Sequence, residues 1–114
     1  MPEAAFKKAL SIDPNNSSAL NNYGQFLCQR KRYEEGEKLF MKAVENPLYR
    51  NAESAYNNAG VCAMAEGKLQ DAERLYRAIL QAQPGHADAN HGLGVLGLGV
   101  FKNPGYAEVD QDQP

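Results

Sequence analysis

The sequence is poor in the residues that several large functional classes require. It has two cysteines and two histidines, and His86 and His91 lie apart from both cysteines, so no spaced set of metal ligands is present. The formal net charge is only −2, and the one basic cluster, residues 30–32, is typical of a solvated turn. No apolar run approaches the roughly 18 residues that a membrane span needs. We therefore expect no metal, no nucleic acid and no membrane span in this chain.

Groups that could perform catalysis are also scarce. His86 and His91 have no serine or cysteine nucleophile suitably placed near them, and we expect surface or capping roles for both. The carboxylates Glu34, Glu35 and Glu37 fall early in a predicted helix, where they complement the dipole at its N-terminus. They have no evident acid–base partner, so we expect no catalytic residues and no enzyme activity.

The glycines of HGLGVLG formally match a dinucleotide-binding fingerprint, Gly92-x-Gly94-x-x-Gly97. That chemistry needs a preceding strand and a turn that directs a helix N-terminus at phosphate. Here the preceding residues, PGHADAN, indicate a turn that enters a helix, and no strand–helix–strand pattern surrounds them. We interpret the match as chance and expect no cofactor.

Two phrases of the sequence nearly repeat each other: NNYGQFLC at residues 21–28 and NNAGVCAM at residues 57–64. Apolar residues around both recur at spacings of three and four, which is typical of helices that bury one face. The shared anchors are Leu20, Tyr23, Gly24, Leu27, Tyr33, Gly36, Phe40 and Ala43 in the first unit, and Tyr56, Ala59, Gly60, Ala63, Leu69, Ala72, Tyr76, Ile79 and Pro84 in the second.

This pattern resembles the tetratricopeptide repeat, a pair of antiparallel helices about 34 residues long. The resemblance implies an all-α fold in which helix pairs stack into a right-handed superhelix. Gly24, Gly60 and Gly94 would let helices approach closely, and Phe40 and Tyr76 would fill the space between neighbouring pairs. We predict helices at residues 3–12, 17–30, 33–45, 52–66, 69–82 and 87–100. They form one domain, 1–101, with a partial repeat at 1–14, repeats at 17–50 and 53–86, a partial repeat at 87–101 and a disordered tail at 102–114.

A narrower resemblance follows from the phrases LNNYGQFLCQRKRYEEGEKLF and NPLYRNAESAYNNAGVCA. They are similar to the type IV pilus biogenesis and stability lipoproteins, the pilotins that help the outer-membrane secretin to assemble. The residues that carry the resemblance are Asn21, Asn22, Tyr23, Gly24, Phe26, Leu27, Cys28, Tyr33, Glu34, Asn46, Pro47, Tyr49, Asn58, Ala59, Gly60 and Cys62.

This resemblance implies a protein-binding scaffold at the periplasmic face of the outer membrane, with secretin subunits or other pilus assembly proteins as partners. Family members carry a lipoprotein signal, whereas the opening residues MPEAAFKKAL have no apolar core and no cleavage site. Either a lipid anchor is absent from this chain because the sequence lacks its natural start, or the protein is cytoplasmic. A cytosolic repeat adaptor that binds an unrelated peptide therefore stays open as the alternative.

Cys28 and Cys62 fall on the first helices of adjacent units, which pack side by side in this fold. The periplasm implied by the resemblance favours a disulfide between them. The alternative, two buried free thiols that act as small apolar residues, is also open.

The paired asparagines precede the helix-contact glycines and place one member of each pair toward the inner groove. By resemblance to peptide-binding repeats, their amides could hold a peptide backbone. The alternative is that they make hydrogen bonds between helices. The candidate groove residues are Ser18, Asn21, Asn22, Gln25, Ser54, Asn57, Asn58 and Val61, and an insertion loop with Asn46, Pro47 and Tyr49 would add contact surface.

The two ends of the repeat array look uncapped. A repeat cannot bury its apolar face alone, so an end without a cap favours marginal stability or self-association. The apolar residues that we expect to be exposed there are Phe6 and Leu10 at the start and Leu93, Val95, Leu96, Leu98 and Val100 at the finish.

Overall fold

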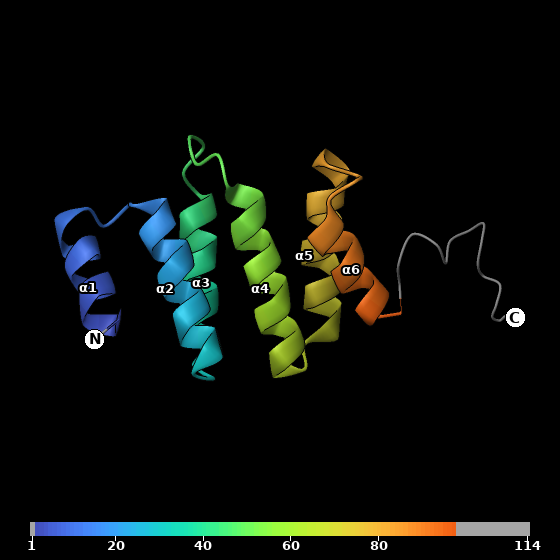
Figure 1. The fold of residues 1–114 in the computed structure, drawn as a ribbon, viewed down its shortest axis with the longest axis horizontal. Coiled ribbons are helices and arrows are strands. Elements are labelled where there is room, and N and C mark those ends of the chain that lie inside the picture. The colour runs from blue at the N-terminus through green and yellow to red at the C-terminus, as the bar shows by residue number, and fades with distance from the viewer. Residues whose placement is uncertain (1, 98–114) are drawn as a thin grey trace, which may run out of the picture.

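The computed structural model describes residues 2–97, which form six helices and contain no strand. Each helix is antiparallel to the next, and all stand side by side in one row (Figure 1). They are α1 (Pro2–Ile12), α2 (Ser17–Gln29), α3 (Tyr33–Val44), α4 (Ala52–Glu66), α5 (Leu69–Ala82) and α6 (Ala87–Val95). The predicted all-α class and the pairing of helices are confirmed. Among the described helices, none combines the length and apolarity needed to cross a bilayer.

The predicted boundaries of α1 to α5 agree with the structure to within one residue. Local hydrogen bonds explain two of the starts: Asn16 Oδ1 accepts from Ala19 N at 3.1 Å before α2, and His86 Nδ1 accepts from Ala89 N at 3.2 Å before α6. The capping role expected for His86 is thus confirmed. Helix α6 ends at Val95, earlier than expected, and residues 98–100 of its predicted range lie outside the described part of the chain.

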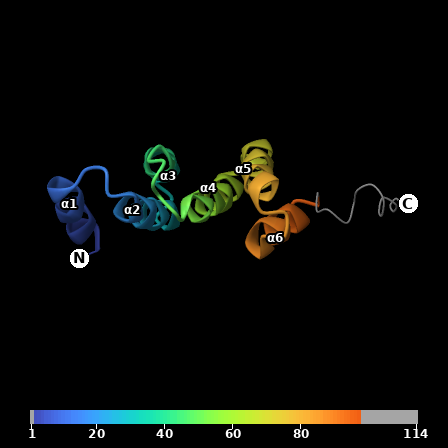
Figure 2. The ribbon, with the colours of Figure 1, turned by 90° about the horizontal axis from the view of Figure 1, so that it is seen from above.

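The helices form two layers when the row is seen from above (Figure 2). Helices α3 and α5 lie on one side of the row and α2 and α6 on the other, with α4 near the middle. This zigzag follows from the pairing of α2 with α3 and of α4 with α5, because each second helix packs beside its own first helix. The row therefore presents two different faces to solvent.

The α2–α3 pair is closed by small residues at its crossing. A Cβ atom at Gly24 would lie 2.7 Å from the Phe40 ring, and one at Gly36 would lie 2.5 Å from Cys28 Sγ. Phe40 is completely buried. The predicted close approach at Gly24 is confirmed, and Gly36 brings the two backbones together from the other side of the contact.

Tyr76 occupies a slot between two glycines of different helices. Tyr76 is 1% exposed, and an added Cβ atom would lie 2.8 Å from its ring at Gly60 on α4 and closer still at Gly92 on α6. The prediction for Gly60 is confirmed. For Gly94 it is wrong within the described residues, where an added Cβ would meet nothing within 4 Å. Gly24 and Gly60 each contact the second helix of their own pair, and Gly94 has no such helix beside it in residues 2–97.

Helix α1 is held against α2 by an aromatic stack and a shared carboxylate. The rings of Phe6 and Tyr23 are 5.2 Å apart, and the Tyr23 hydroxyl donates to Glu3 Oε2 at 2.7 Å. Arg32 also reaches Glu3 Oε2, at 3.0 Å. Burial, followed by the hydrogen bond to Glu3, raises the pKa of Tyr23 to about 12. These contacts half-bury Phe6, which we had expected to be exposed.

The expectation of exposed apolar ends is correct only in part. The prediction that Leu93 is exposed is wrong, because Leu93 is completely buried beside Tyr76 in the core formed by α4, α5 and α6. Leu10 is half-buried against the cluster around Leu20, whereas Val95 is 59% exposed. Residues 98 and 100 and the tail at 102–114 lie outside the described residues, and the proposed division into whole and partial repeats stays a prediction.

Candidate protein-binding surface

Asn21 lies at the centre of a hydrogen-bond network between α2, α4 and the loop that joins α3 to α4. Its Nδ2 donates to Tyr49 Oη at 3.1 Å and to Ser54 Oγ at 3.3 Å, and its Oδ1 accepts from Asn58 Nδ2 at 3.0 Å. Asn21 is only 5% exposed. The sequence left two roles open for Asn21, peptide binding and hydrogen bonding between helices. The structure shows the second role, because both the nitrogen and the oxygen of its amide already bond within the chain.

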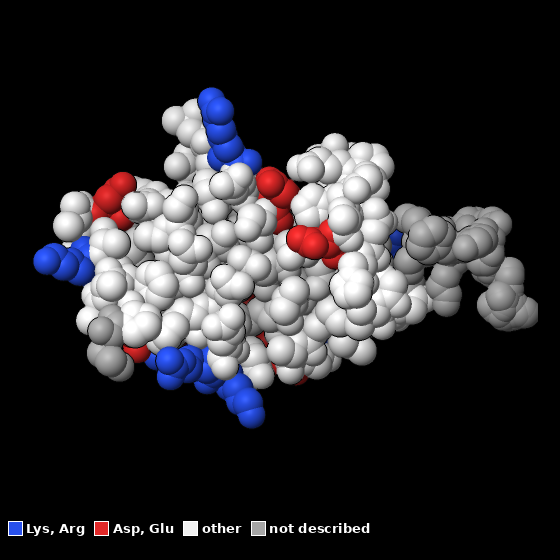
Figure 3. Space-filling view, in the orientation of Figure 1, with Lys and Arg blue, Asp and Glu red and all other residues white. Residues whose placement is uncertain are grey.

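The surface formed by α2 and α4 is rich in amides. We call it the amide face and define it by Asn22, Gln25, Gln29, Asn58 and Val61. The first three are exposed, Asn58 is half-buried, and Val61 is 54% exposed. Figure 3 shows the molecule in the orientation of Figure 1, with α2 in front of α3, and on this side charged atoms lie mostly at the margins. The amide face therefore offers hydrogen-bond donors and acceptors with little net charge.

A pocket of about 170 Å³ opens in the amide face between α2 and α4. Its lining includes Phe40, the disulfide-bonded Cys28 and Cys62, and the exposed Val61. The pocket thus combines an apolar lining with amides around it, an arrangement common in sites that bind peptide side chains. The other lining residues are Gln25, Gln29, Asn58 and Ala65.

Cys28 and Cys62 form a disulfide in the structure, with their Cα atoms 5.7 Å apart. They lie on the facing sides of α2 and α4, one repeat apart. The sequence was compatible with either a disulfide or two free thiols, and in the structure the two cysteines form a disulfide. Because it joins the first helices of adjacent repeats, it fixes their separation at the pocket.

The remaining groove candidates differ in their surroundings. Ser18 is exposed near the start of α2, and Ser54 accepts the hydrogen bond from Asn21. Asn57 is half-buried, and its Oδ1 is buried without a hydrogen-bond donor among residues 2–97. Asn57 therefore retains an unused acceptor at the edge of the network, whereas Ser54 serves to join α2 to α4.

The insertion loop projects from the row between α3 and α4 (Figure 1). It has a defined shape: Leu48 N donates to Asn46 Oδ1 at 2.9 Å, and Tyr49 N donates to Asn46 O at 3.0 Å. The Tyr49 hydroxyl anchors the loop to Asn21. Pro47 and Leu48 are exposed, and Leu48 is 85% exposed, the largest value among the bulky apolar side chains described. The loop therefore displays a leucine at a fixed position.

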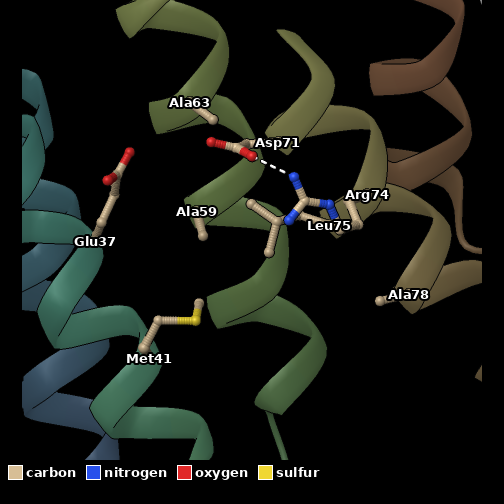
Figure 4. A pocket seen from close by; sticks show the side chains of 8 residues that line it. All are labelled: Glu37, Met41, Ala59, Ala63, Asp71, Arg74, Leu75 and Ala78. Atoms are coloured by element: carbon tan, nitrogen blue, oxygen red, sulfur yellow. Dashed lines mark hydrogen bonds and ion pairs between the residues drawn. The ribbon is translucent and has the colours of Figure 1, made fainter. Parts of the chain in front are cut away.

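A second pocket, of about 340 Å³, lies between α3, α4 and α5 (Figure 4). Glu37 and Met41 extend from α3 on one side, and residues of α5 extend from the other. Ala59 and Ala63 of α4 form its floor. The α5 residues are Asp71, Arg74, Leu75 and Ala78.

Glu37 has an unusual environment at the rim of this second pocket. Burial, followed by a hydrogen bond with the Glu66 carboxyl and the charge of that group, raises the pKa of Glu37 to about 7. Lys68 acts in the opposite direction, and its Nζ lies 3.3 Å from Glu66 Oε2. At neutral pH the Glu37 carboxyl is therefore protonated for part of the time.

Sequence reasoning missed the second pocket because its parts are distant along the chain. Glu37 looked like an ordinary charge in the first turns of a helix, and Glu66 ends a different helix. The signal that could have found the site is the spacing of Glu37 and Met41 on one face of α3, together with small residues at 59 and 63 on the helix that packs beside it. No group of three or more metal-ligating residues gathers anywhere in residues 2–97.

Comparisons with known protein families and solved structures agree with this arrangement of helices. Models of the tetratricopeptide repeat match residues 5–38, 43–87 and 58–98. The chain is 31% identical over 81 residues to the type IV pilus assembly protein PilF of Pseudomonas aeruginosa, an alignment that covers 71% of this chain and 32% of PilF.

Two solved structures have the same fold over most of this chain. The crystal structure of PilW, described as a widely conserved type IV pilus biogenesis factor, superposes with a TM-score of 0.74 at 34% identity, covering 84% of this chain and 46% of PilW. The structure of Pseudomonas aeruginosa PilF gives a TM-score of 0.77 at 27% identity, covering 88% and 44%. The chain thus spans less than half the length of these relatives. It belongs to the tetratricopeptide-repeat family and is a homologue of the type IV pilus biogenesis proteins PilF and PilW.

Proposed function

We propose that this chain is a non-catalytic scaffold of type IV pilus biogenesis that binds secretin subunits through its amide face and helps them to assemble at the outer membrane. The observation that carries the proposal is the pocket of about 170 Å³ beside the disulfide, surrounded by uncharged amides. The relationship to PilF and PilW, both named for pilus assembly or biogenesis, supplies the process.

The amide face suits an extended segment of a partner protein. A peptide backbone presents alternating donors and acceptors, and the side chains of Asn22, Gln25 and Gln29 offer both. The apolar lining beside Val61 can accept one small apolar side chain of the same segment. Because these contacts carry no net charge, binding should depend on shape and hydrogen bonding more than on ionic attraction.

The disulfide supports a place for the protein in an oxidising compartment. Disulfides persist in the bacterial periplasm and are rare in the reducing cytosol. Cys28 and Cys62 are thus consistent with work at the periplasmic face of the outer membrane, where a secretin is assembled. The insertion loop supplies a further contact at Leu48, which stands 85% exposed on a loop that internal hydrogen bonds hold in shape.

The proposal is tested by capture of purified secretin subunits on the immobilised chain. Val61→Arg places a charge at the pocket and should lower the affinity about tenfold, as loss of a central contact typically does. Asn22→Ala removes an exposed amide that has no hydrogen bond within residues 2–97, so its effect on binding is not an effect on folding. Capture should change little when the salt concentration is raised.

The matched control is Lys38→Ala, an exposed substitution on α3 and away from the amide face. It should leave capture unchanged. If Val61→Arg and Asn22→Ala capture as much secretin as the original chain, the amide face is not the binding surface. If the original chain captures none, secretin is not the partner.

A further inference from the structure

The second pocket, with a volume of about 340 Å³, is large enough to accept one long side chain. Ala59 and Ala63 keep its floor low, while Met41 and Leu75 form apolar walls on opposite sides (Figure 4). It lies between α3 and α5, which are on the side of the row away from α2 and α6 (Figure 2). A ligand there would not compete with one on the amide face.

Some of the charged side chains around this pocket have an ion-pair partner within the described part of the chain, and one does not. Asp71 is paired with Arg74, and Glu66 Oε2 is paired with Lys68. Glu37 makes no ion pair with any residue from 2 to 97, and the buried Glu66 Oε1 has no hydrogen-bond donor in the same range while Glu37 is ionised. A carboxylate oxygen removed from water without a partner is costly, so this corner of the pocket favours a donor that carries positive charge.

We propose that this pocket binds a lysine or arginine side chain of a partner protein, with the aliphatic stem on Met41 and Leu75 and the cationic group on Glu37. Long basic side chains place their methylene groups along apolar surface and keep the charge at its edge. An uncharged apolar side chain would leave Glu37 desolvated and unpaired, and an acidic one would be repelled. The pocket's apolar walls and the unpaired Glu37 at its rim together suit a long cationic side chain.

The perturbed titration of Glu37 agrees with this reading. Its pKa is raised to about 7 because burial and the facing Glu66 carboxyl both disfavour a second negative charge, while Lys68 compensates only in part and Asp71 adds to the repulsion. A cation bound between the carboxyls would remove that repulsion. Binding should therefore release the proton that Glu37 holds for part of the time near neutral pH.

The probe is a capped peptide, Ac-Gly-Ala-Lys-Ala-Gly-amide, titrated into the isotopically labelled chain and followed by nuclear magnetic resonance. We expect saturable shifts of the Met41 methyl group and of amides in α3 and α5, with no shifts on the amide face. The same peptide with norleucine in place of lysine should bind at least fivefold more weakly, and the glutamate version should not bind.

Two variants test the pocket independently of folding. Glu37→Gln removes the unpaired charge and should weaken the lysine peptide at least fivefold. Ala78→Phe, at an exposed position that lines the pocket, should block it by bulk. The control Glu53→Gln removes the same charge from α4 outside the pocket and should leave binding unchanged. Equal binding of the lysine and norleucine peptides, or full binding by Glu37→Gln, would overturn the proposal.

Discussion

Replacing Gly92 with alanine should destabilise the protein although alanine is the better helix former. The new Cβ atom would lie 2.6 and 2.7 Å from atoms of the Tyr76 ring. The ring has no room to retreat, because Gly60 closes the other side of its slot and Tyr76 is 1% exposed. Overpacking of this kind costs about 1–3 kcal/mol, and we take about 3 kcal/mol because the slot is closed on both sides. Helix propensity returns about 1 kcal/mol, so the free energy of unfolding should fall by about 2 kcal/mol.

Gly94→Ala is the matched control on the same helix. An added Cβ there meets nothing within 4 Å among the described residues, so only the propensity gain should remain, about 0.5–1 kcal/mol in favour of folding. Urea unfolding followed by far-ultraviolet circular dichroism measures both variants on one scale. If Gly92→Ala proves as stable as Gly94→Ala, the slot around Tyr76 is not tightly packed and the reasoning is refuted.

Three further outcomes follow from the hydrogen bonds, the disulfide and the acidic pair. Reduction of the Cys28–Cys62 bond, which closes a loop across 34 positions, should lower the free energy of unfolding by about 3–4 kcal/mol; equal urea midpoints with and without reductant would contradict this. Asn21→Ala removes three hydrogen bonds and should cost about 1–3 kcal/mol, measured by the same urea unfolding. The pKa of Glu37 rises from 4.5 to about 7 on folding, so the folded state binds the extra proton and stability falls as pH rises between those values. The full linkage value is about 3 kcal/mol, which solvent screening at an open rim reduces to about 1 kcal/mol. Glu37→Gln should therefore gain stability relative to the original chain at pH 8 and not at pH 4, and Glu66→Gln should bring the carboxyl titration of Glu37, followed by nuclear magnetic resonance, back toward its ordinary range.

The helices were predictable from sequence because their signals are local. Apolar spacing and the turn residues around Pro14 and Pro84 placed α1 to α5 to within one residue. The close approach at Gly24 and Gly60 was also predictable, since each contacts an aromatic residue of its own helix pair at a fixed offset. Contacts within one repeat follow the period of the sequence, so the period is sufficient to find them.

Contacts between repeats were harder to predict, because they depend on how two units are rotated relative to each other. Gly94 is in register with Gly60, so the repeat pattern predicts the close contact at Gly94. The contact with Tyr76 is instead made by Gly92, which lies in the repeat that follows Tyr76. Leu93 is buried for the same reason, since α6 covers the end of the α4–α5 pair. Asn21 is one of the predicted groove residues, but the geometry shows that its amide is used between helices, while Asn22 beside it stays exposed.

The disulfide has a consequence for how the array comes apart. In a stack of repeats each unit contacts only its neighbours, so units can open one at a time from an end. A covalent link between α2 and α4 merges two such units into a single cooperative block, and only helices outside the linked pair can then fray separately. Oxidation thereby sets the size of the block around α2 and α4 that must unfold as one.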